Sequence, residues 1–229
     1  MNQLTGHIFL SGSSPSTTNI HYLSGFTAPD PFLYMKTSNG GYLLVSAMEK
    51  GRAEKQSTAG TTVLTPQDLG LKGKKAWNRT EQVKGLMERA GIRRLRVSAD
   101  FPIGLFQTLE KKGLRISVDK NPACPERNIK TSDEISRLRK SQQAAVMAMK
   151  AGMALIGSSK TGPENGLYIG KEKLTSEKVR HLIHKTLIDH DCAGVETIVA
   201  GGDQGTDPHE RGYGPLYAGQ SIILDIFPR

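Results

Sequence analysis

The chain has 229 residues, of which 31 are Lys or Arg and 22 are Asp or Glu, so its formal net charge is +9. Hydrophobic residues make up 37% and charged residues 23%, which is ordinary for a globular protein and disfavours disorder. No apolar run approaches the roughly 20 residues of a membrane-spanning helix. The N-terminus also lacks the basic region of a secretory signal. Since the only cysteines are Cys124 and Cys192, we expect a cytoplasmic protein without a disulfide framework.

The basic excess is concentrated in the middle of the chain, where residues 61–130 hold 15 basic and 7 acidic residues. This segment is a candidate surface for an acidic partner. Nucleic-acid binding would also require interleaved aromatic residues for stacking, and only Trp77, Phe101 and Phe106 are available. A solvated face or a subunit contact is therefore favoured, and nucleic acid is not an expected partner.

The first 120 residues alternate between strand and helix patterns. The expected elements are a strand at 43–45, a helix at 81–90 ending before Gly91, a strand at 95–99, a helix at 103–112 ending before Gly113, and a strand at 114–118. This alternation predicts βαβ units. The expected fold class is thus α/β, with a mainly parallel or mixed sheet and flanking helices.

Two prolines within Asn121–Pro125 break the pattern, so we place a domain boundary there and expect domains at 1–125 and 126–229. Thr131 and Glu134 are spaced as a capping box before a long amphipathic helix. Its apolar stripe, the pattern of a helix face that packs, consists of Ile135, Leu138, Ala145, Val146, Met149 and Met153. A second helix near Thr175 and strands at 197–200 and 221–227 make this domain α+β.

Three weaker motifs favour structural interpretations. The glycines at 152 and 157 follow a helix, whereas a phosphate loop precedes one, so a helix-ending loop is favoured. His181 and His184 lie beside an apolar helix stripe and are expected on a solvated face rather than in a metal site. For the two cysteines, buried or inert thiols are favoured over a nucleophile.

The last thirty residues are the most informative about chemistry. Asp225 lies within an otherwise apolar strand, where a carboxylate is costly unless it is paired or bound to a metal. His209 lies on a glycine-rich loop that precedes this strand. A carboxylate that holds a cation and an imidazole that stabilises an oxyanion or moves a proton suit metal-assisted hydrolysis. The alternative is an Asp bonded to a backbone N–H and a solvated His, and the residues alone leave both open.

Three segments, taken in order, resemble the pita-bread metallopeptidases, which include Xaa-Pro aminopeptidase, prolidase, methionine aminopeptidase and the non-metal relative creatinase. They are 19–26 (NIHYLSGF), 130–139 (KTSDEISRLR) and 199–225. The resemblance implies a creatinase-like N-terminal domain followed by the start of a pita-bread catalytic domain.

The resemblance also implies roles for two residues. Asp225 matches the first carboxylate ligand of a dinuclear metal centre, and His209 matches the catalytic His that contacts the substrate carbonyl. The family uses two divalent ions, with manganese expected and cobalt or zinc as alternatives. Their bridging hydroxide attacks the peptide bond after the N-terminal residue, often with proline next. The implied partners are a peptide substrate and further copies of the chain, assembled into a homo-oligomer through the N-terminal domain.

The family's other ligands, a second Asp followed by His and Glu residues, have no counterpart after Asp225. We therefore expect the pita-bread domain to be incomplete, with its last strand at an unpaired edge. We also expect no bound metal in this chain and no peptide hydrolysis by it alone. Two alternatives stay open: a creatinase-like amidinohydrolase that uses the matching His without metal, and a non-catalytic pita-bread binding module.

Overall fold

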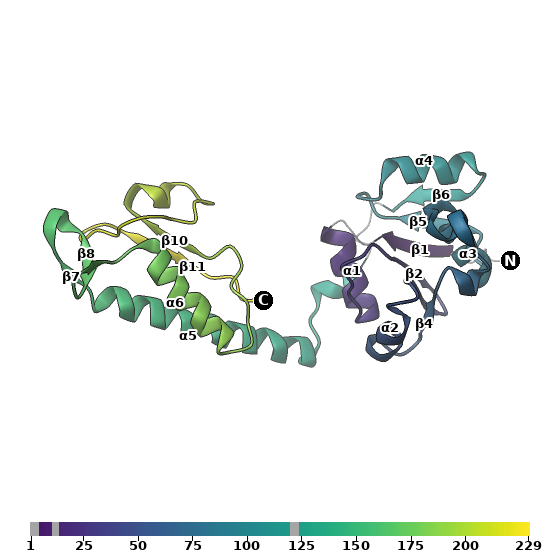
Figure 1. The fold of residues 1–229 in the computed structure, drawn as a ribbon. Coiled ribbons are helices and arrows are strands. Elements are labelled where there is room, and N and C mark those ends of the chain that lie inside the picture. Colours follow the sequence, from purple (N-terminus) through teal and green to yellow (C-terminus); the bar gives the residue numbers. More distant parts are fainter. Residues whose placement is uncertain (1–4, 11–13, 120–123) are drawn as a thin grey trace. The chain divides into compact units, whose positions relative to one another are not determined.

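A computed structural model describes residues 5–10, 14–119 and 124–229. The chain forms two compact units, Met1–Ile129 and Lys130–Arg229, which are drawn in Figure 1 and are considered separately below. The proline-containing break used to predict the domain boundary falls largely on 121–123, outside the described residues. Within the part of the chain that the structure describes, no helix is both long enough and apolar enough to cross a membrane.

The first unit is built on one six-stranded sheet with the order β4-β3-β2-β1-β5-β6. Its strands are β1 (Thr5–Leu10), β2 (Leu33–Thr37), β3 (Gly40–Leu44), β4 (Thr61–Leu64), β5 (Arg94–Val97) and β6 (Arg115–Val118). β2 runs antiparallel to both β1 and β3, whereas the pairs β3–β4, β1–β5 and β5–β6 are parallel. The mixed sheet confirms the expected fold class.

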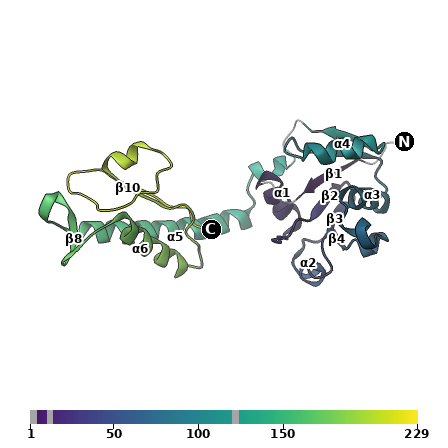
Figure 2. The same cartoon turned by 45° about the horizontal axis from the view of Figure 1, so that its top comes forward.

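Helices cover both faces of this sheet (Figure 2). They are α1 (Ser14–Ser24), α2 (Lys50–Gln56), α3 (Arg79–Ala90) and α4 (Ile103–Lys111). Because side chains alternate along a strand, Ile8 faces a core that includes residues of α3 and α4, and Phe9 faces one that includes residues of α1 and α2. The Asn78 side chain caps α3 by accepting bonds from two backbone N–H groups, and Gly91 ends this helix with a left-handed φ of 66°.

The second unit contains two long helices and short strands. They are α5 (Ser132–Gly157), β7 (Lys160–Thr161), β8 (Leu167–Ile169), β9 (Glu172–Lys173), α6 (Ser176–Ile188), β10 (Ile198–Gly201) and β11 (Ile222–Asp225). The capping box at Thr131 and Glu134 forms as predicted. α5 continues through Gly152 to Gly157, so these glycines form no phosphate loop.

The packed face of α5 differs from the predicted apolar stripe. Its buried residues are the small Ala144, Ala148 and Gly152. A Cβ atom at Gly152 would lie 3.1 Å from Cδ1 of Ile183 on α6, so the two helices meet closely at this point. Most of the predicted stripe is exposed, including Leu138 (55%) and Met153 (59%). The prediction that this stripe is the packed face of the helix was wrong, because periodicity identifies an apolar face without showing which face a neighbouring element covers.

Candidate functional site

His209 lies on the loop between β10 and β11 and its side chain is exposed. Its backbone N–H donates a hydrogen bond to Oδ1 of Asp207 at 3.1 Å, with Pro208 between them. This short turn holds the backbone of the loop and leaves the imidazole in solvent. The structure therefore places His209 where a bound molecule could reach it.

Two further contacts hold the loop, one within it and one against the sheet. The Gln204 side chain accepts from the backbone N–H of Tyr213 at 3.0 Å and donates to its carbonyl oxygen at 2.9 Å. Gly212 has a φ of 82°, and a Cβ atom there would collide with the carbonyl oxygen of Val199. Only glycine fits this position, so the segment before Tyr213 lies directly beside β10.

Asp225 ends β11, where it is paired with Ile198 of β10, and its side chain is exposed. Although its strand is otherwise apolar, the Asp225 carboxylate therefore does not bear the cost of burial. Along β11 one set of alternate side chains packs on the core, and the other set, with Asp225, faces solvent. The sequence hid this alternation because the solvent-facing neighbours Ile223 (43% exposed) and Phe227 (48% exposed) are also apolar.

β10 contacts both the segment that follows His209 and the strand that carries Asp225. The Val199 N–H donates to the Arg211 carbonyl oxygen at 3.0 Å, while β10 pairs with β11 on its other side. Among the described residues no hydrogen bond or ion pair joins His209 to Asp225. Nor does any group of three His, Cys, Asp or Glu residues in 5–10, 14–119 and 124–229 gather as metal ligands would. These residues do not fit a metal centre by themselves, so no catalytic step through a metal is derived from them.

The histidine pair on α6 divides into one exposed and one half-buried residue. His181 is exposed as predicted, but His184 packs against Gly194, and its Nε2 atom is buried with no hydrogen-bond partner among the described residues. Burial is the main cause that lowers the pKa of His184, and the nearby Arg180, Arg211 and His181 lower it further. The prediction of a solvated face was thus wrong for His184, because the α6 face that carries it lies under the loop at Gly194.

The cysteines do not form part of a reactive cluster in the described residues. Cys124 is buried in the core below α1, and burial raises the pKa of its thiol to about 11. Cys192 is half-buried.

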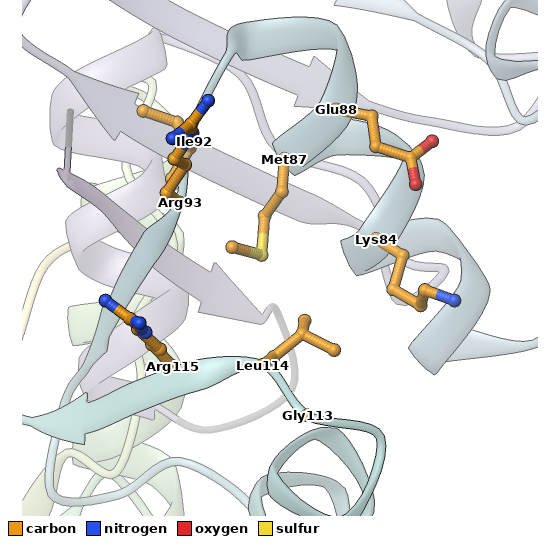
Figure 3. A pocket seen from close by; sticks show the side chains of 8 residues that line it. All are labelled: Lys84, Met87, Glu88, Ile92, Arg93, Gly113, Leu114 and Arg115. Atoms are coloured by element: carbon orange, nitrogen blue, oxygen red, sulfur yellow. The ribbon is translucent and has the colours of Figure 1, made fainter. Parts of the chain in front are cut away.

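The basic middle segment contributes to a cavity of about 380 Å³ beside α3, β5 and β6 (Figure 3). Lys84, Arg93 and Arg115 line it together with the carboxylate-bearing Glu88. In Figure 3 the ammonium group of Lys84 is turned away from the apolar centre at Met87, so the cations do not converge on one point. The cavity also adjoins the C-terminal ends of α3 and α4.

A second cavity, which was not predicted from the sequence, lies between the loops that follow β3 and β4. Its volume is about 460 Å³, and its lining includes Trp77, whose side chain is 82% exposed. Trp77 is the only tryptophan of the chain. The sequence signal that could have indicated this cavity is a single large aromatic residue within a basic, glycine-containing segment.

Comparisons with known proteins bear on both units. The family model of the creatinase/prolidase N-terminal domain matches residues 9–140, more than half of the chain. The chain belongs to this family. The resemblance identified from the sequence is therefore confirmed, while a search of curated proteins finds no match.

Solved structures with the same fold include several proline-specific peptidases. The prolidase from Pyrococcus furiosus is 15% identical and has a TM-score of 0.73, and the match covers 98% of this chain and 62% of the prolidase. For the Xaa-Pro dipeptidase from Bacillus anthracis the identity is 16%, the TM-score 0.75 and the coverages 97% and 56%. The X-Pro aminopeptidase from Thermotoga maritima is 16% identical with a TM-score of 0.70, and the match covers 97% of this chain and 58% of the aminopeptidase. The chain thus spans less than two thirds of these proteins.

Proposed function

We propose that the chain supplies the N-terminal domain and the first part of the catalytic domain of a Xaa-Pro peptidase. Such an enzyme removes the N-terminal residue of a peptide whose second residue is proline. The observation that supports this proposal is the match of both units together, over 97–98% of the chain, to solved peptidases of this specificity.

Within this proposal His209 contacts the substrate carbonyl and Asp225 contributes one carboxylate to a centre of two divalent ions, manganese first. Both side chains are exposed, so a substrate or an ion can reach them. Asp225 alone is a poor cation ligand, because tight sites combine several carboxylate or imidazole groups. The chain by itself is thus proposed to be inactive.

The test is hydrolysis of Xaa-Pro dipeptides and longer Xaa-Pro peptides in the presence of Mn²⁺, Co²⁺ or Zn²⁺. We expect no release of the first residue by this chain, and metal-dependent release by the product of its complete reading frame. In that product His209→Ala and Asp225→Asn should each abolish turnover, whereas Asp203→Asn, an exposed carboxylate change on the same loop, should not. Creatine hydrolysis without metal, or peptide hydrolysis by this chain alone, would contradict the proposal.

We further propose that the chain self-associates through its N-terminal unit. Sedimentation velocity over a range of protein concentrations tests this proposal, and a strictly monomeric chain at every concentration would exclude it.

A further inference from the structure

The cavity beside Trp77 lies at the edge of the sheet where the parallel strands β3 and β4 end. In α/β sheets ligands bind preferentially outside the carboxyl ends of such strands. Its volume of about 460 Å³ falls within the range typical of small-molecule sites. Its lining includes the buried Phe32 and two exposed apolar residues, Trp77 and Met48, of which Met48 is 89% exposed. This combination offers an apolar surface that water covers in the free protein.

The cavity also carries one unpaired charge of each sign. Asp30 is exposed and forms no hydrogen bond or ion pair with any described residue. The Arg79 guanidinium donates to the Pro31 carbonyl oxygen and to Oε1 of Gln82, both at 2.7 Å, and both acceptors are neutral. No ion pair joins the two charges within the described residues.

The other charge in the wall is already compensated. Glu49 accepts a hydrogen bond from Nε of Arg52 at 2.8 Å, so it presents little free charge to the cavity. In addition, the Oγ atom of Ser46 is buried and has no hydrogen-bond partner among the described residues. A buried hydroxyl without a partner is costly, and a bound polar group would relieve that cost.

We propose that this cavity binds a free α-amino acid with a large apolar side chain. Its carboxylate meets Arg79, its ammonium group meets Asp30, and its side chain covers the exposed Trp77 and Met48. A zwitterion is the ligand that satisfies one cation and one anion at once, and the apolar walls exclude small polar amino acids. The cavity is lined only by residues of the first unit, whereas His209 and Asp225 belong to the second.

Trp77 provides the assay, because it is the sole tryptophan and lines the cavity. L-phenylalanine should shift its emission to shorter wavelength with saturation and protect it from acrylamide quenching. Phenethylamine lacks the carboxylate and 3-phenylpropionate lacks the amine. Each should bind about tenfold more weakly than L-phenylalanine, since each forfeits one charge-assisted contact. Glycine, which lacks the side chain, should cause no change.

Variants assign the charges. Asp30→Asn should weaken L-phenylalanine binding about tenfold and leave 3-phenylpropionate unaffected. Arg79→Gln should weaken the binding of L-phenylalanine and leave the binding of phenethylamine unaffected. Asp203→Asn, a matched carboxylate change in the other unit, should leave the affinities for all three aromatic compounds unchanged. Arg79 also holds two structural contacts, so circular dichroism must show that its variant is folded; if it is not, Asp30→Asn with the analogue series decides.

Two outcomes would overturn the inference. Equal affinity for the three aromatic compounds would show an apolar cavity without charge recognition. An absence of saturation up to about 10 mM of every compound would show that the cavity is no binding site.

Discussion

The close contact between α5 and α6 makes Gly152 a sensitive probe of the second unit. A Cβ atom there would lie 3.1 Å from Cδ1 and 3.2 Å from Cγ1 of Ile183, which requires Ile183 to move by a few tenths of an ångström. Replacing glycine by alanine inside a helix stabilises it by about 1 kcal/mol. We expect this gain to offset the crowding, so Gly152→Ala should change the free energy of unfolding by less than about 0.5 kcal/mol.

Gly152→Leu should behave differently, because its extra carbons have no space between the helices. Overpacking of this kind costs about 1–3 kcal/mol. Ala154→Leu is a matched control: residue 154 lies on the exposed side of the same helix, so its substitution should be neutral within about 0.5 kcal/mol. Ile183→Val removes the Cδ1 atom and should cost about 0.5–1.5 kcal/mol alone. Combined with Gly152→Ala it should cost less than the sum of the two changes, by at least about 0.5 kcal/mol.

Hydrogen exchange measured by mass spectrometry is the suitable assay, because peptides from the two units report separately. Gly152→Leu should accelerate exchange in α5 and α6, while peptides of the first unit serve as an internal reference. Wild-type protection in Gly152→Leu, or equal acceleration by Ala154→Leu, would refute the close packing of the two helices at this point.

Three other predictions concern pH, a helix cap and the loop of the candidate site. The pKa of His184 is lowered from about 6.5, so the folded state binds its proton less readily than the unfolded state does. The stability that the neutral side chain contributes is therefore complete above pH 6.5 and is lost as the pH falls below 6.5. In melting experiments His184→Phe should flatten this pH dependence, and His181→Gln should not. Asn78→Ala removes the cap of α3 and should cost about 0.5–2 kcal/mol in urea unfolding, and a neutral result would contradict the observed cap. Gly212→Ala should destabilise the second unit by about 1–3 kcal/mol, which melting temperatures would reveal; unchanged melting would refute the requirement for glycine.

Local signals predicted the helix ends well. Gly91 ends α3 because glycine adopts a left-handed φ without penalty, and the pair Thr131 and Glu134 begins α5 because both side chains bond to free N–H groups. These interactions depend only on residues close in sequence. Sequence spacing alone is therefore sufficient to find them.

The wrong or missing predictions concern features that depend on residues distant in the sequence. The packed face of α5 is set by small residues that admit α6, and its apolar stripe gave no sign of this. The environment of Asp225 depends on which face of β11 meets the core, and the strand is apolar on both sides. The cavity at Trp77 joins the segments around residues 30, 46, 66 and 77, which no local pattern connects.

The exposed stripe of α5 has a consequence for how the chain behaves in concentrated solution. Leu138 and Met153 offer apolar surface that water covers unfavourably. Attraction between such surfaces strengthens with warming and with sulfate or phosphate salts, whereas attraction between charges weakens as salt is added. This chain should therefore precipitate at a low concentration of ammonium sulfate. Polar substitutions along the stripe should raise that concentration without altering the fold.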